Sequence, residues 1–591
     1  MIYAPGAVED GGRTDAQGAR HYSRAEVVRR RRLLLRAVPL VVLALIALVV
    51  GLLVAGSPGR AERRTVERFA TLWAQGDYGD MYTLLDAAAR ARIAPAAFDE
   101  AYRAASETAT LRDVEIGRVG KRHDDAIPVA VTVRTRVFGT FHAVLDVPVS
   151  GSGDAMRIAW RPQTVFPGLQ PRERLTRTTE LPPRAALLAR DGTVLAAGAG
   201  RTSQAQDVSD QIVGQLGPIP ADRQGALRAS GYPEDALVGT SGLERAFEYD
   251  LAGRPGGTLL AGGRVLARTR PRPARAVRTT LDVGVERAAI AALAGRYGGI
   301  AAIVPQTGEI LALAGVAFSA LQPPGSTFKV ITLTGALESH LADARSTYPI
   351  QDAAVIDGVT LQNANGEYCG GTLEQAFAHS CNSVFAPLGA QLGARRLVDV
   401  AERYGFDEQP AIPGAAESTI PSAREIGDDL AVGSSAIGQG LVQATTLQMT
   451  DVAATIAMRG RRPQPTLRLG DEPRFVRVTR RSVAREVARM MLAVVRYGTG
   501  TAAAIAGVEV AGKTGTAELE STVPPDDRTP QDPPRPDAPP PLKPDAWFVA
   551  YAPERRPRIA VGALLVEAGA GGDVAAPAAR GVLLAGLQRR R

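Results

Sequence analysis

Pro324-Gly325-Ser326-Thr327-Phe328-Lys329 opens a run whose apolar positions, including Ile331 and Leu337, recur at helical spacing. Residues i and i+3 of a helix share one face, so the Lys329 amine can reach the Ser326 hydroxyl. A free serine is a poor nucleophile, and lysine can act as its base only when the amine is neutral. Backbone N–H groups at the start of a helix could stabilise an oxyanion. The stretch predicts a serine nucleophile, although most isolated Ser-x-x-Lys sequences are surface pairs.

Lysine is rare in this chain. Of the 69 Lys and Arg residues only four are lysines, namely Lys121, Lys329, Lys513 and Lys543. Arginine cannot release its proton in a protein, whereas a buried lysine can be tuned to do so. Lys329 and Lys513 lie in Ser- and Thr-rich motifs, so these two predict chemistry that needs a titratable amine. The alternative is that a lysine remains in this arginine-rich chain by chance, and we assign this explanation to Lys121 and Lys543.

Two further motifs follow the first. Ser380-Cys381-Asn382 lies at the junction of two helical stretches, where Ser380 could relay a proton and Asn382 could hold a substrate amide. Lys513-Thr514-Gly515-Thr516 follows a strand pattern; its Lys513 charge could lower the pKa of Lys329, and Gly515 would let a substrate backbone approach. Thr514 and Thr516 could donate hydroxyls to a carboxylate. Taken singly, the motif at Ser380 could be a helix cap, and the motif at Lys513 could be a turn at the end of a strand.

All three motifs, in this order, resemble the signature of penicillin-binding proteins, and the chain resembles class B members, which are serine D,D-transpeptidases. Cys381 occupies the variable middle position of the second motif. Gly438-Gln439-Gly440 and Trp547-Phe548 also resemble family segments near the active site. The resemblance implies four catalytic residues, Ser326, Lys329, Ser380 and Lys513. It implies six substrate-binding residues, Asn382, Thr514, Gly515, Thr516, Gly438 and Gln439.

The implied reaction cross-links peptidoglycan. Ser326 attacks the penultimate D-Ala carbonyl of a stem peptide while Lys329 takes its proton, and the N–H groups of Ser326 and Thr516 form the oxyanion hole. Ser380 protonates the leaving D-Ala, and the amine of a neighbouring stem resolves the acyl-enzyme. A β-lactam mimics the donor and stalls the enzyme as an acyl adduct. No cofactor is expected.

The region 279–590 is expected to be the transpeptidase domain, an α/β fold of the β-lactamase and transpeptidase type. Its predicted five-stranded antiparallel sheet comes from both ends of the region, and helices dominate from Ser326 to Arg496. The Pro-rich stretch 524–544 is expected to be a mobile loop rather than a domain boundary. The predicted strands are 300–304, 309–314, 508–510, 547–551 and 559–567.

Two smaller regions precede this domain. Residues 60–165 combine helical patterns over 60–105 with strands over 126–160, a small α+β domain. This region resembles the cone-shaped N-terminal domain of low-affinity, MecA-like penicillin-binding proteins. Residues 175–275 resemble the β-rich pedestal or dimerisation region, with Arg184-Ala185 where the family usually has Arg-Gly. The pedestal is predicted to be too rich in Gly, Arg and Pro for a large core of its own.

Residues 37–56 carry no charge and are long enough to cross a hydrocarbon core of roughly 30 Å as one helix. Arginines at 29–32 and 36 flank this segment, so residues 1–36 are expected to be a cytoplasmic tail and the remainder to be exported. A cleaved signal peptide is the alternative, although the apolar run is long for one. The expected location is the cell membrane, with one transmembrane helix and the catalytic domain outside.

The remaining composition narrows the function. The chain has a net charge of +8, but many of its arginines gather beside the apolar segment and at the C-terminus. This distribution does not match a nucleic-acid-binding surface, which would place a basic stripe on a folded face. Cys369 and Cys381 could form a disulfide in an exported domain or remain two buried thiols. The five histidines and two cysteines show no metal-ligand spacing.

Rival functions are a D,D-carboxypeptidase, a β-lactamase, a bifunctional class A enzyme, and a non-catalytic wall-assembly scaffold or β-lactam sensor. No Glu-x-x-x-Asn-type element lies between the second and third motifs to support a β-lactamase, and residues 60–275 are too short for a glycosyltransferase domain plus a pedestal. Stem peptides, β-lactams and cell-wall synthesis proteins, including a separate glycosyltransferase, are the expected partners.

Overall fold

A computed structural model describes residues 41–49, 58–518 and 543–589. The chain divides into two compact units, one of residues 1–177 with 258–268 and one of residues 178–257 with 269–591. The predicted tail 1–36, most of the predicted membrane segment 37–56 and most of the Pro-rich stretch 524–544 lie outside the described residues. Residues 41–49 are helical. Within the described ranges, no helix combines the length and the apolar character that crossing a bilayer requires.

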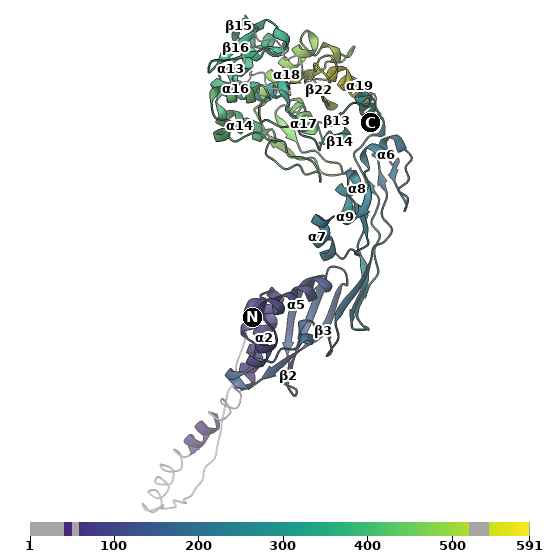
Figure 1. The fold of residues 1–591 in the computed structure, drawn as a ribbon, viewed down its shortest axis with the longest axis vertical. Coiled ribbons are helices and arrows are strands. Elements are labelled where there is room, and N and C mark those ends of the chain that lie inside the picture. The colour runs from purple at the N-terminus through teal and green to yellow at the C-terminus, as the bar shows by residue number, and fades with distance from the viewer. Residues whose placement is uncertain (1–40, 50–57, 519–542, 590–591) are drawn as a thin grey trace, which may run out of the picture. The chain divides into compact units, whose positions relative to one another are not determined.

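The first unit packs helices against a four-stranded antiparallel sheet in the order β1-β2-β3-β4 (Figure 1). Inward residues of β2 alternate as predicted, since Ile127, Val129, Val131 and Val133 are all buried. The strand β1, which sequence reasoning missed, completes the sheet. The elements are α2 (Pro58–Gln75), α3 (Tyr78–Thr83), α4 (Ala87–Arg92), α5 (Pro95–Thr108), β1 (Leu111–Val119), β2 (Ala126–Thr135), β3 (Thr140–Ser150) and β4 (Arg157–Ile158).

Short elements make up residues 175–278. Strands β5, β10 and β11 form one sheet in the order β11-β10-β5, while β12-β6-β7 and β8-β9 form two more. The elements are β5 (Leu175–Glu180), β6 (Leu187–Leu188), β7 (Val194–Ala196), α6 (Gln206–Ile212), β8 (Leu216–Pro218), α7 (Gln224–Ala229), β9 (Leu237–Gly239), α8 (Gly242–Ala246), α9 (Glu248–Leu251), β10 (Gly256–Ala261), β11 (Arg264–Thr269) and β12 (Val277–Arg278).

A network of buried ion pairs links the short elements of this region, whose apolar core is small. Arg184 donates to Glu244 at 2.6 Å and to Glu248 at 2.9 Å, and Arg201 adds a contact to Glu244 at 2.5 Å. Both carboxylates are 1% exposed. Removing one partner of such a network would leave an uncompensated buried charge. Arg184 therefore has a structural role, although its neighbour departs from the family pattern.

The central sheet of the second unit is antiparallel, with five strands in the order β14-β13-β23-β22-β21. This confirms the predicted five-stranded sheet built from both ends of the region. Strands β21 and β22, which flank the Pro-rich stretch, pair directly with each other. The third strand was predicted at 508–510, which is too early in the sequence. The observed strand β21 begins at Ala511 and contains the Lys513 motif. The strands are β13 (Gly298–Ile303), β14 (Ile310–Gly315), β21 (Ala511–Ala517), β22 (Asp545–Ala552) and β23 (Ile559–Leu565).

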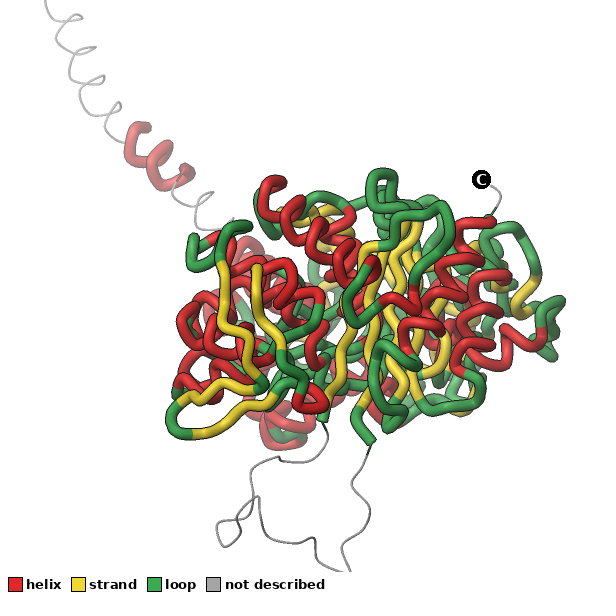
Figure 2. The backbone as a smooth tube through the Cα atoms, turned by 90° about the horizontal axis from the view of Figure 1, so that it is seen from above, coloured by secondary structure: helices red, strands yellow, loops and turns green. Residues whose placement is uncertain are grey.

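Helices cover both faces of this sheet, which explains why its strands read as continuous apolar runs (Figure 2). On β22, Phe548 and Ala550 belong to the core cluster under α10 (Val283–Leu293) and α19 (Ala575–Gln588). Trp547 and Val549 belong to the opposite cluster, which includes α17 (Thr446–Ala457). Strand alternation therefore divides the core into two layers.

The helical block between β14 and β21 also contains two-stranded sheets that sequence reasoning missed. Strands β15 and β18 pair, as do β16 and β17, and β19 and β20. The elements are α11 (Lys329–Glu338), β15 (Thr347–Gln351), β16 (Ala353–Ile356), β17 (Val359–Gln362), β18 (Cys369–Thr372), α12 (Leu373–Ala378), α13 (Asn382–Leu392), α14 (Ala394–Arg403), α15 (Ala423–Ile426), α16 (Asp429–Ala436), β19 (Arg461–Pro463), β20 (Phe475–Arg477) and α18 (Arg481–Arg496).

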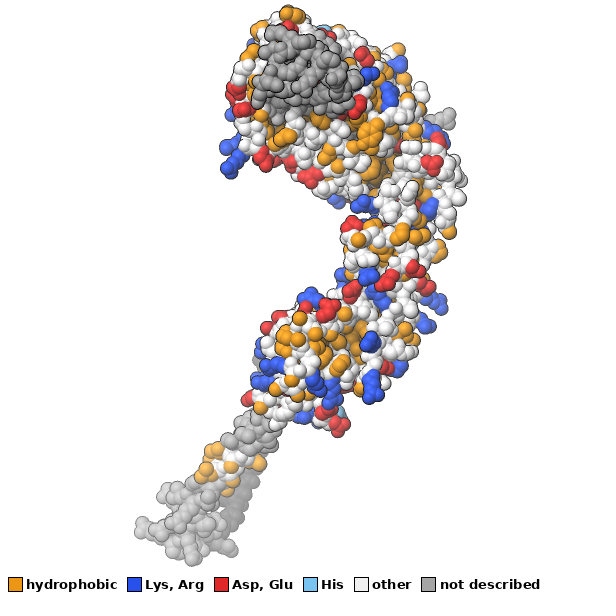
Figure 3. All heavy atoms as spheres, viewed as in Figure 1, with side chains coloured by type: hydrophobic (Ala, Val, Ile, Leu, Met, Phe, Trp, Pro, Cys, Tyr) orange, Lys and Arg blue, Asp and Glu red, His pale blue; other side chains and the backbone are white. Residues whose placement is uncertain are grey.

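The visible surface mixes charges of both signs (Figure 3). Ion pairs account for part of this mixing; for example, Arg134 of β2 contacts Asp113 and Glu115 of β1, each at 2.7 Å. These exposed pairs contribute little to stability.

Candidate active site

Ser326 lies in a short 3-10 helix, η4 (Gly325–Phe328), directly before α11. Its side chain is half-buried, and its hydroxyl makes no hydrogen bond to another described residue. The preceding Gly325 has a φ of +52° and donates its N–H to the Gly438 carbonyl at 2.9 Å. A positive φ favours glycine, so this turn depends on Gly325 to present the serine.

Glycines allow η4 to lie directly against the edge strand β21. A Cβ on Gly325 would lie 2.7 Å from the Thr516 carbonyl oxygen, and a Cβ on Gly515 would lie 2.9 Å from the Pro324 carbonyl oxygen. A Cβ on Gly438 would lie 2.1 Å from the Gly325 carbonyl oxygen. Gly515 and Gly438 thus make room for the turn that carries Ser326, and their predicted contact with substrate stays a prediction.

The Lys329 side chain is fully buried and points at the second motif. Its Nζ donates to the Ser380 carbonyl at 2.6 Å and to Asn382 Oδ1 at 2.7 Å, and lies 3.3 Å from Ser380 Oγ. It also lies 5.7 Å from the centre of the Phe385 ring. No hydrogen bond joins Lys329 to Ser326 among the described residues.

Burial lowers the pKa of Lys329 well below its usual value, and the neighbouring Lys513 lowers it further. A neutral amine has two N–H groups and one lone pair. The two short contacts, to the Ser380 carbonyl and to Asn382, use both N–H groups. The lone pair therefore stays available to accept a proton, which is what a base requires.

Lys513 approaches the same serine from β21. Its Nζ donates to Ser380 Oγ at 2.7 Å and to the Thr514 carbonyl at 3.0 Å, and burial lowers its pKa to about 7. Both amines thus contact one hydroxyl. Ser380 Oγ accepts from Lys513 and lies 3.3 Å from Lys329 Nζ, so a proton taken up by Lys329 has a path through the Ser380 hydroxyl.

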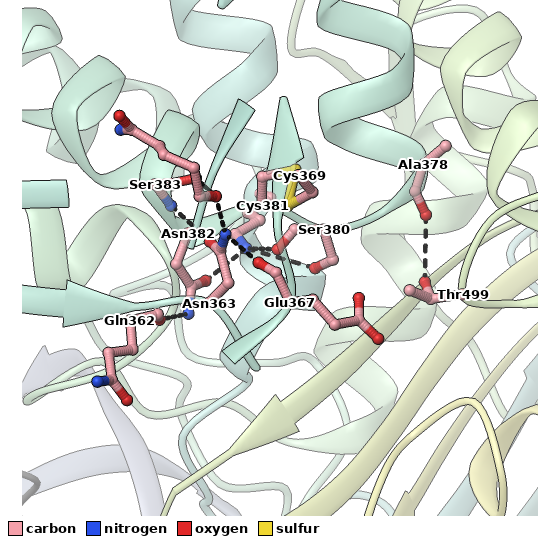
Figure 4. The surroundings of a disulfide bond; sticks show 12 residues. Gln362, Asn363, Glu367, Cys369, Ala378, Ser380, Cys381, Asn382, Ser383 and Thr499 are labelled. Carbon is pink, nitrogen blue, oxygen red and sulfur yellow. Dashed lines mark hydrogen bonds between the residues drawn. A yellow bond between two sulfur atoms is a disulfide. The ribbon is translucent and has the colours of Figure 1, made fainter. Parts of the chain in front are cut away.

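Ser380 connects α12 to α13 in a left-handed conformation, with a φ of +61°. Such a conformation costs on the order of 1 kcal/mol for a non-glycine residue and persists only where neighbours hold it. Cys381, the next residue, forms a disulfide with Cys369 of β18, with a Cα–Cα distance of 5.8 Å (Figure 4). The covalent link therefore lies inside the second motif, between Ser380 and Asn382.

Asn382 and Thr514 are engaged within the protein. Asn382 accepts from Lys329 and donates its Nδ2 to the Gln362 carbonyl at 2.9 Å (Figure 4). The Thr514 hydroxyl lies 2.6 Å from that of Thr499, whose N–H donates to the Ala378 carbonyl at 3.0 Å. These contacts hold Lys329 and tie β21 to the end of α12, while the predicted substrate contacts of Asn382 and Thr514 stay predictions.

Asn382, Gln439 and Thr516 are the predicted substrate residues that keep half-exposed side chains. Thr516 accepts a long hydrogen bond from the Gly571 N–H at 3.5 Å. Sequence reasoning missed Thr499, which no motif marks, because its role follows from the fold. In the described ranges, no group of three or more His, Cys, Asp or Glu side chains is arranged to hold a metal ion.

Breaking the disulfide should slow the site as well as destabilise it. We expect the Cys369→Ser, Cys381→Ser double variant to lose about 3 kcal/mol of unfolding free energy, as for other short disulfide loops. Because Cys381 separates Ser380 from Asn382, the rate at which a β-lactam acylates Ser326, the reaction that the family resemblance implies, should fall roughly tenfold, on the order of one lost hydrogen bond. Stopped-flow acylation of folded protein checks this; an unchanged rate would mean that packing alone positions Ser380.

Lys513 should make stability rise with pH. Its folded pKa of about 7 lies below the roughly 10.4 of an unfolded lysine, so between these values the unfolded chain binds the extra proton. Unfolding free energy then increases by up to about 1.4 kcal/mol per pH unit. Guanidinium unfolding from pH 7.5 to 9.5 should show a smaller slope for Lys513→Met, whereas the exposed Lys121→Met should keep the full slope.

Three family models match the chain in succession. The NTF2-like N-terminal transpeptidase domain matches residues 61–173, and the penicillin-binding protein dimerisation domain matches residues 194–270. The penicillin-binding protein transpeptidase domain matches residues 298–584, which contain all three motifs.

Curated relatives carry the same motif-bearing region. The chain is 37% identical over 300 residues to the peptidoglycan D,D-transpeptidase PbpA of Mycolicibacterium smegmatis, covering 46% of this chain and 56% of the relative. It is 26% identical over 379 residues to the peptidoglycan D,D-transpeptidase MrdA of Acinetobacter baumannii, covering 53% and 56%. The chain thus spans just over half the length of these relatives.

A solved structure of PBPA from Mycobacterium tuberculosis is similar, with 26% identity and a TM-score of 0.54 over 69% of this chain and 99% of that chain. The ceftriaxone acyl-enzyme complex of the same protein has 26% identity and a TM-score of 0.55, covering 69% and 98%.

Proposed function

The chain belongs to the class B penicillin-binding proteins, and from this premise we propose that it is a peptidoglycan D,D-transpeptidase inhibited by β-lactams. One observation carries the proposal, namely the two buried amines that share the Ser380 hydroxyl in the domain whose short helix η4 presents Ser326. The similarity to relatives named for this activity supports the same reaction.

In the acylation step, Ser326 Oγ attacks the penultimate D-Ala carbonyl of a donor stem. Lys329 takes the serine proton with the lone pair that its two short hydrogen bonds leave free. Catalytic hydrogen bonds often tighten only when substrate binds, so we expect the Ser326–Lys329 bond to form then. The backbone N–H groups of Ser326 and Thr516 would stabilise the oxyanion, which fits the close approach of Thr516 to Gly325.

The proton then passes from Lys329 through Ser380 to the departing D-Ala amine, and the bond to that amine breaks. Lys513 keeps the path oriented because it donates to Ser380 Oγ. In the second step the amine of a neighbouring stem attacks the acyl-enzyme, its proton returns along the same path, and Ser326 is released. A β-lactam would form the same acyl bond without a separate leaving group.

The donor is proposed to bind along the outer edge of β21, which is the last strand of the sheet among the described residues. An extended peptide can add to such an edge through main-chain hydrogen bonds. Among the half-exposed side chains, Thr516 and Gln439 are proposed to meet it, while Lys513 contributes charge toward the terminal carboxylate of the stem.

The membrane location is also a proposal. The uncharged segment 37–56, flanked by arginines, supports a single helix with the catalytic domain outside the cell. Residues 41–49 are helical, and their large apolar side chains are exposed, from 47% at Val49 to 62% at Leu43. A D,D-transpeptidase of this class needs glycan strands, so we propose that it works beside a separate glycosyltransferase.

Turnover of a synthetic stem peptide ending in D-Ala-D-Ala, with and without a second stem that carries a free amine, tests the function. We expect a cross-linked dimer and one D-Ala released for each bond formed. D-Ala release with no dimer would indicate a carboxypeptidase instead. Stable penicillin labelling without either product would indicate a scaffold or a β-lactam sensor.

A further inference from the structure

A cavity of about 90 Å³ lies in the transpeptidase domain away from Ser326, which does not line it. Three segments form its walls, namely α17, the strand β19 with the two residues after it, and the loop 405–415. One water needs roughly 10–15 Å³, so the cavity could hold a small molecule rather than a single water.

Two buried polar atoms at this cavity have no hydrogen-bond partner among the described residues, namely Asp451 Oδ1 and Arg462 Nε. Asp451 is 2% exposed and Arg462 is 6% exposed. Leaving such atoms unpartnered costs roughly 1–3 kcal/mol each when nothing binds them. Both residues line the cavity, so a ligand that bonds to them would remove this cost.

The site is built to hold these two groups. A Cβ on Gly405 would lie 1.8 Å from Arg462 Nη1, so a glycine with a φ of +101° is what makes room for the guanidinium. Arg462 forms its ion pair with Glu408 rather than with Asp451. Asp451 follows Leu447 and Gln448 by four and three residues on α17, which places all three on one helix face.

Charge favours an uncharged ligand. The Arg462–Glu408 pair is neutral as a whole. Burial raises the pKa of Asp451 well above its usual range; Arg462 opposes this shift and Glu408 adds to it. A protonated carboxyl offers one O–H donor and one acceptor side by side. The remaining walls are largely apolar, with Pro410, Ile412 and Leu447 among them.

We propose that this cavity is a second binding site of the domain, which takes a small uncharged ligand carrying an amide N–H and C=O on the same side. The amide oxygen accepts from the Asp451 O–H and from Arg462 Nε. The amide N–H donates to the other Asp451 oxygen, and the hydrocarbon part lies against the apolar walls. The site does not depend on the transpeptidase reaction.

The cavity wall is connected to the catalytic turn. Phe406, next to Gly405, packs edge-on against Phe328 of η4 with ring centres 5.4 Å apart. Gln448 donates to the Tyr404 carbonyl at 2.7 Å, and the Tyr404 hydroxyl lies 2.9 Å from that of Thr334 on α11. A bound ligand would thus lie one layer of side chains from the helix that carries Lys329.

The probe for this site is 2-pyrrolidinone, a lactam with its N–H and C=O on one side. We expect it to bind the full-length chain with a Kd on the order of 1 mM, measured by ligand-observed NMR titration. N-methyl-2-pyrrolidinone lacks the donor, and cyclopentanone lacks the nitrogen, so both should bind at least tenfold more weakly. Equal binding of the three compounds, or no binding of 2-pyrrolidinone, would overturn the proposal.

Two variants of one residue sharpen the test. Asp451→Asn keeps a donor and an acceptor and should bind the lactam within about threefold of wild type. Asp451→Leu is similar in size but apolar, and should bind at least tenfold more weakly while staying folded, because it removes an unpartnered buried carboxyl. If Asp451→Leu did not fold, the three probes on the wild type would still decide the outcome.

Acylation with penicillin separates this site from the catalytic one. We expect the lactam to bind equally to acylated protein and to Ser326→Ala, because Ser326 does not line the cavity. Displacement of the lactam by acylation would contradict a site that is independent of Ser326 and would overturn the proposal. Binding to Ser326→Ala would persist even if the transpeptidase function were wrong.

Discussion

Ser326→Ala should take no penicillin at all. Without the hydroxyl there is no atom to form the acyl bond, and loss of the nucleophile in serine acyl-enzymes lowers kcat by a factor on the order of 10⁶. Intact-mass spectrometry after incubation with penicillin should show one added adduct on the wild type and none on the variant. Because the Ser326 hydroxyl makes no hydrogen bond to another described residue, stability should change by less than about 0.5 kcal/mol.

Ser339→Ala is the matched control for this variant. Ser339 follows α11, the helix that begins directly after the Ser326 turn, and its hydroxyl donates to the Gly335 carbonyl at 2.7 Å. It should keep full labelling. An adduct of unchanged mass on folded Ser326→Ala would place the nucleophile elsewhere, and Ser380 would be the first residue to examine.

Lys329→Met should lower the acylation rate by about 10²–10⁴, the range that a positioned general base contributes. Lys329→Arg should be as slow as Lys329→Met, because arginine keeps the positive charge but cannot give up its proton to become a base. Stopped-flow measurement with a chromogenic cephalosporin gives the rates. Lys121→Met, at an exposed lysine outside the site, should react like the wild type.

The arginine variant separates two roles for Lys329. If Lys329 mainly supplied charge or held Asn382 and Ser380 in place, Lys329→Arg would recover much of the lost rate. Substantial activity in Lys329→Arg would therefore contradict the base assignment while leaving the positioning contacts intact. Circular dichroism and the thermal midpoint of each variant show whether the fold is retained.

The sequence alone could predict the five-stranded sheet and the meeting of the three motifs. Strands that are apolar throughout must be buried on both faces. When such strands lie at both ends of one region, pairing them in one sheet covered by helices is the simplest way to bury them. The scarcity of lysine singles out Lys329 and Lys513, and both amines reach Ser380 in the fold. The burial of Lys513 follows from its place in the apolar sheet, since its strand β21 is buried almost throughout.

Local sequence could not predict which partner each polar group takes. Asn382 turns its amide to Lys329 and to the Gln362 carbonyl, and Thr514 turns its hydroxyl to Thr499, fifteen residues earlier. Gly515 faces the Pro324 carbonyl rather than open space. Each of these contacts is set by how elements distant in the sequence pack together. The short sheets β15–β18 were missed for the same reason, because they depend on long-range pairing.

Burial divides the four lysines into two chemically distinct pairs. Lys329 and Lys513 are 0% exposed, whereas Lys121 and Lys543 are exposed. An acetylating reagent should therefore modify the exposed pair on the folded chain and spare the buried pair. Acetyl groups found on Lys329 or Lys513 by peptide mapping would then show that the domain had unfolded. These two amines can therefore serve as internal reporters of the folded state.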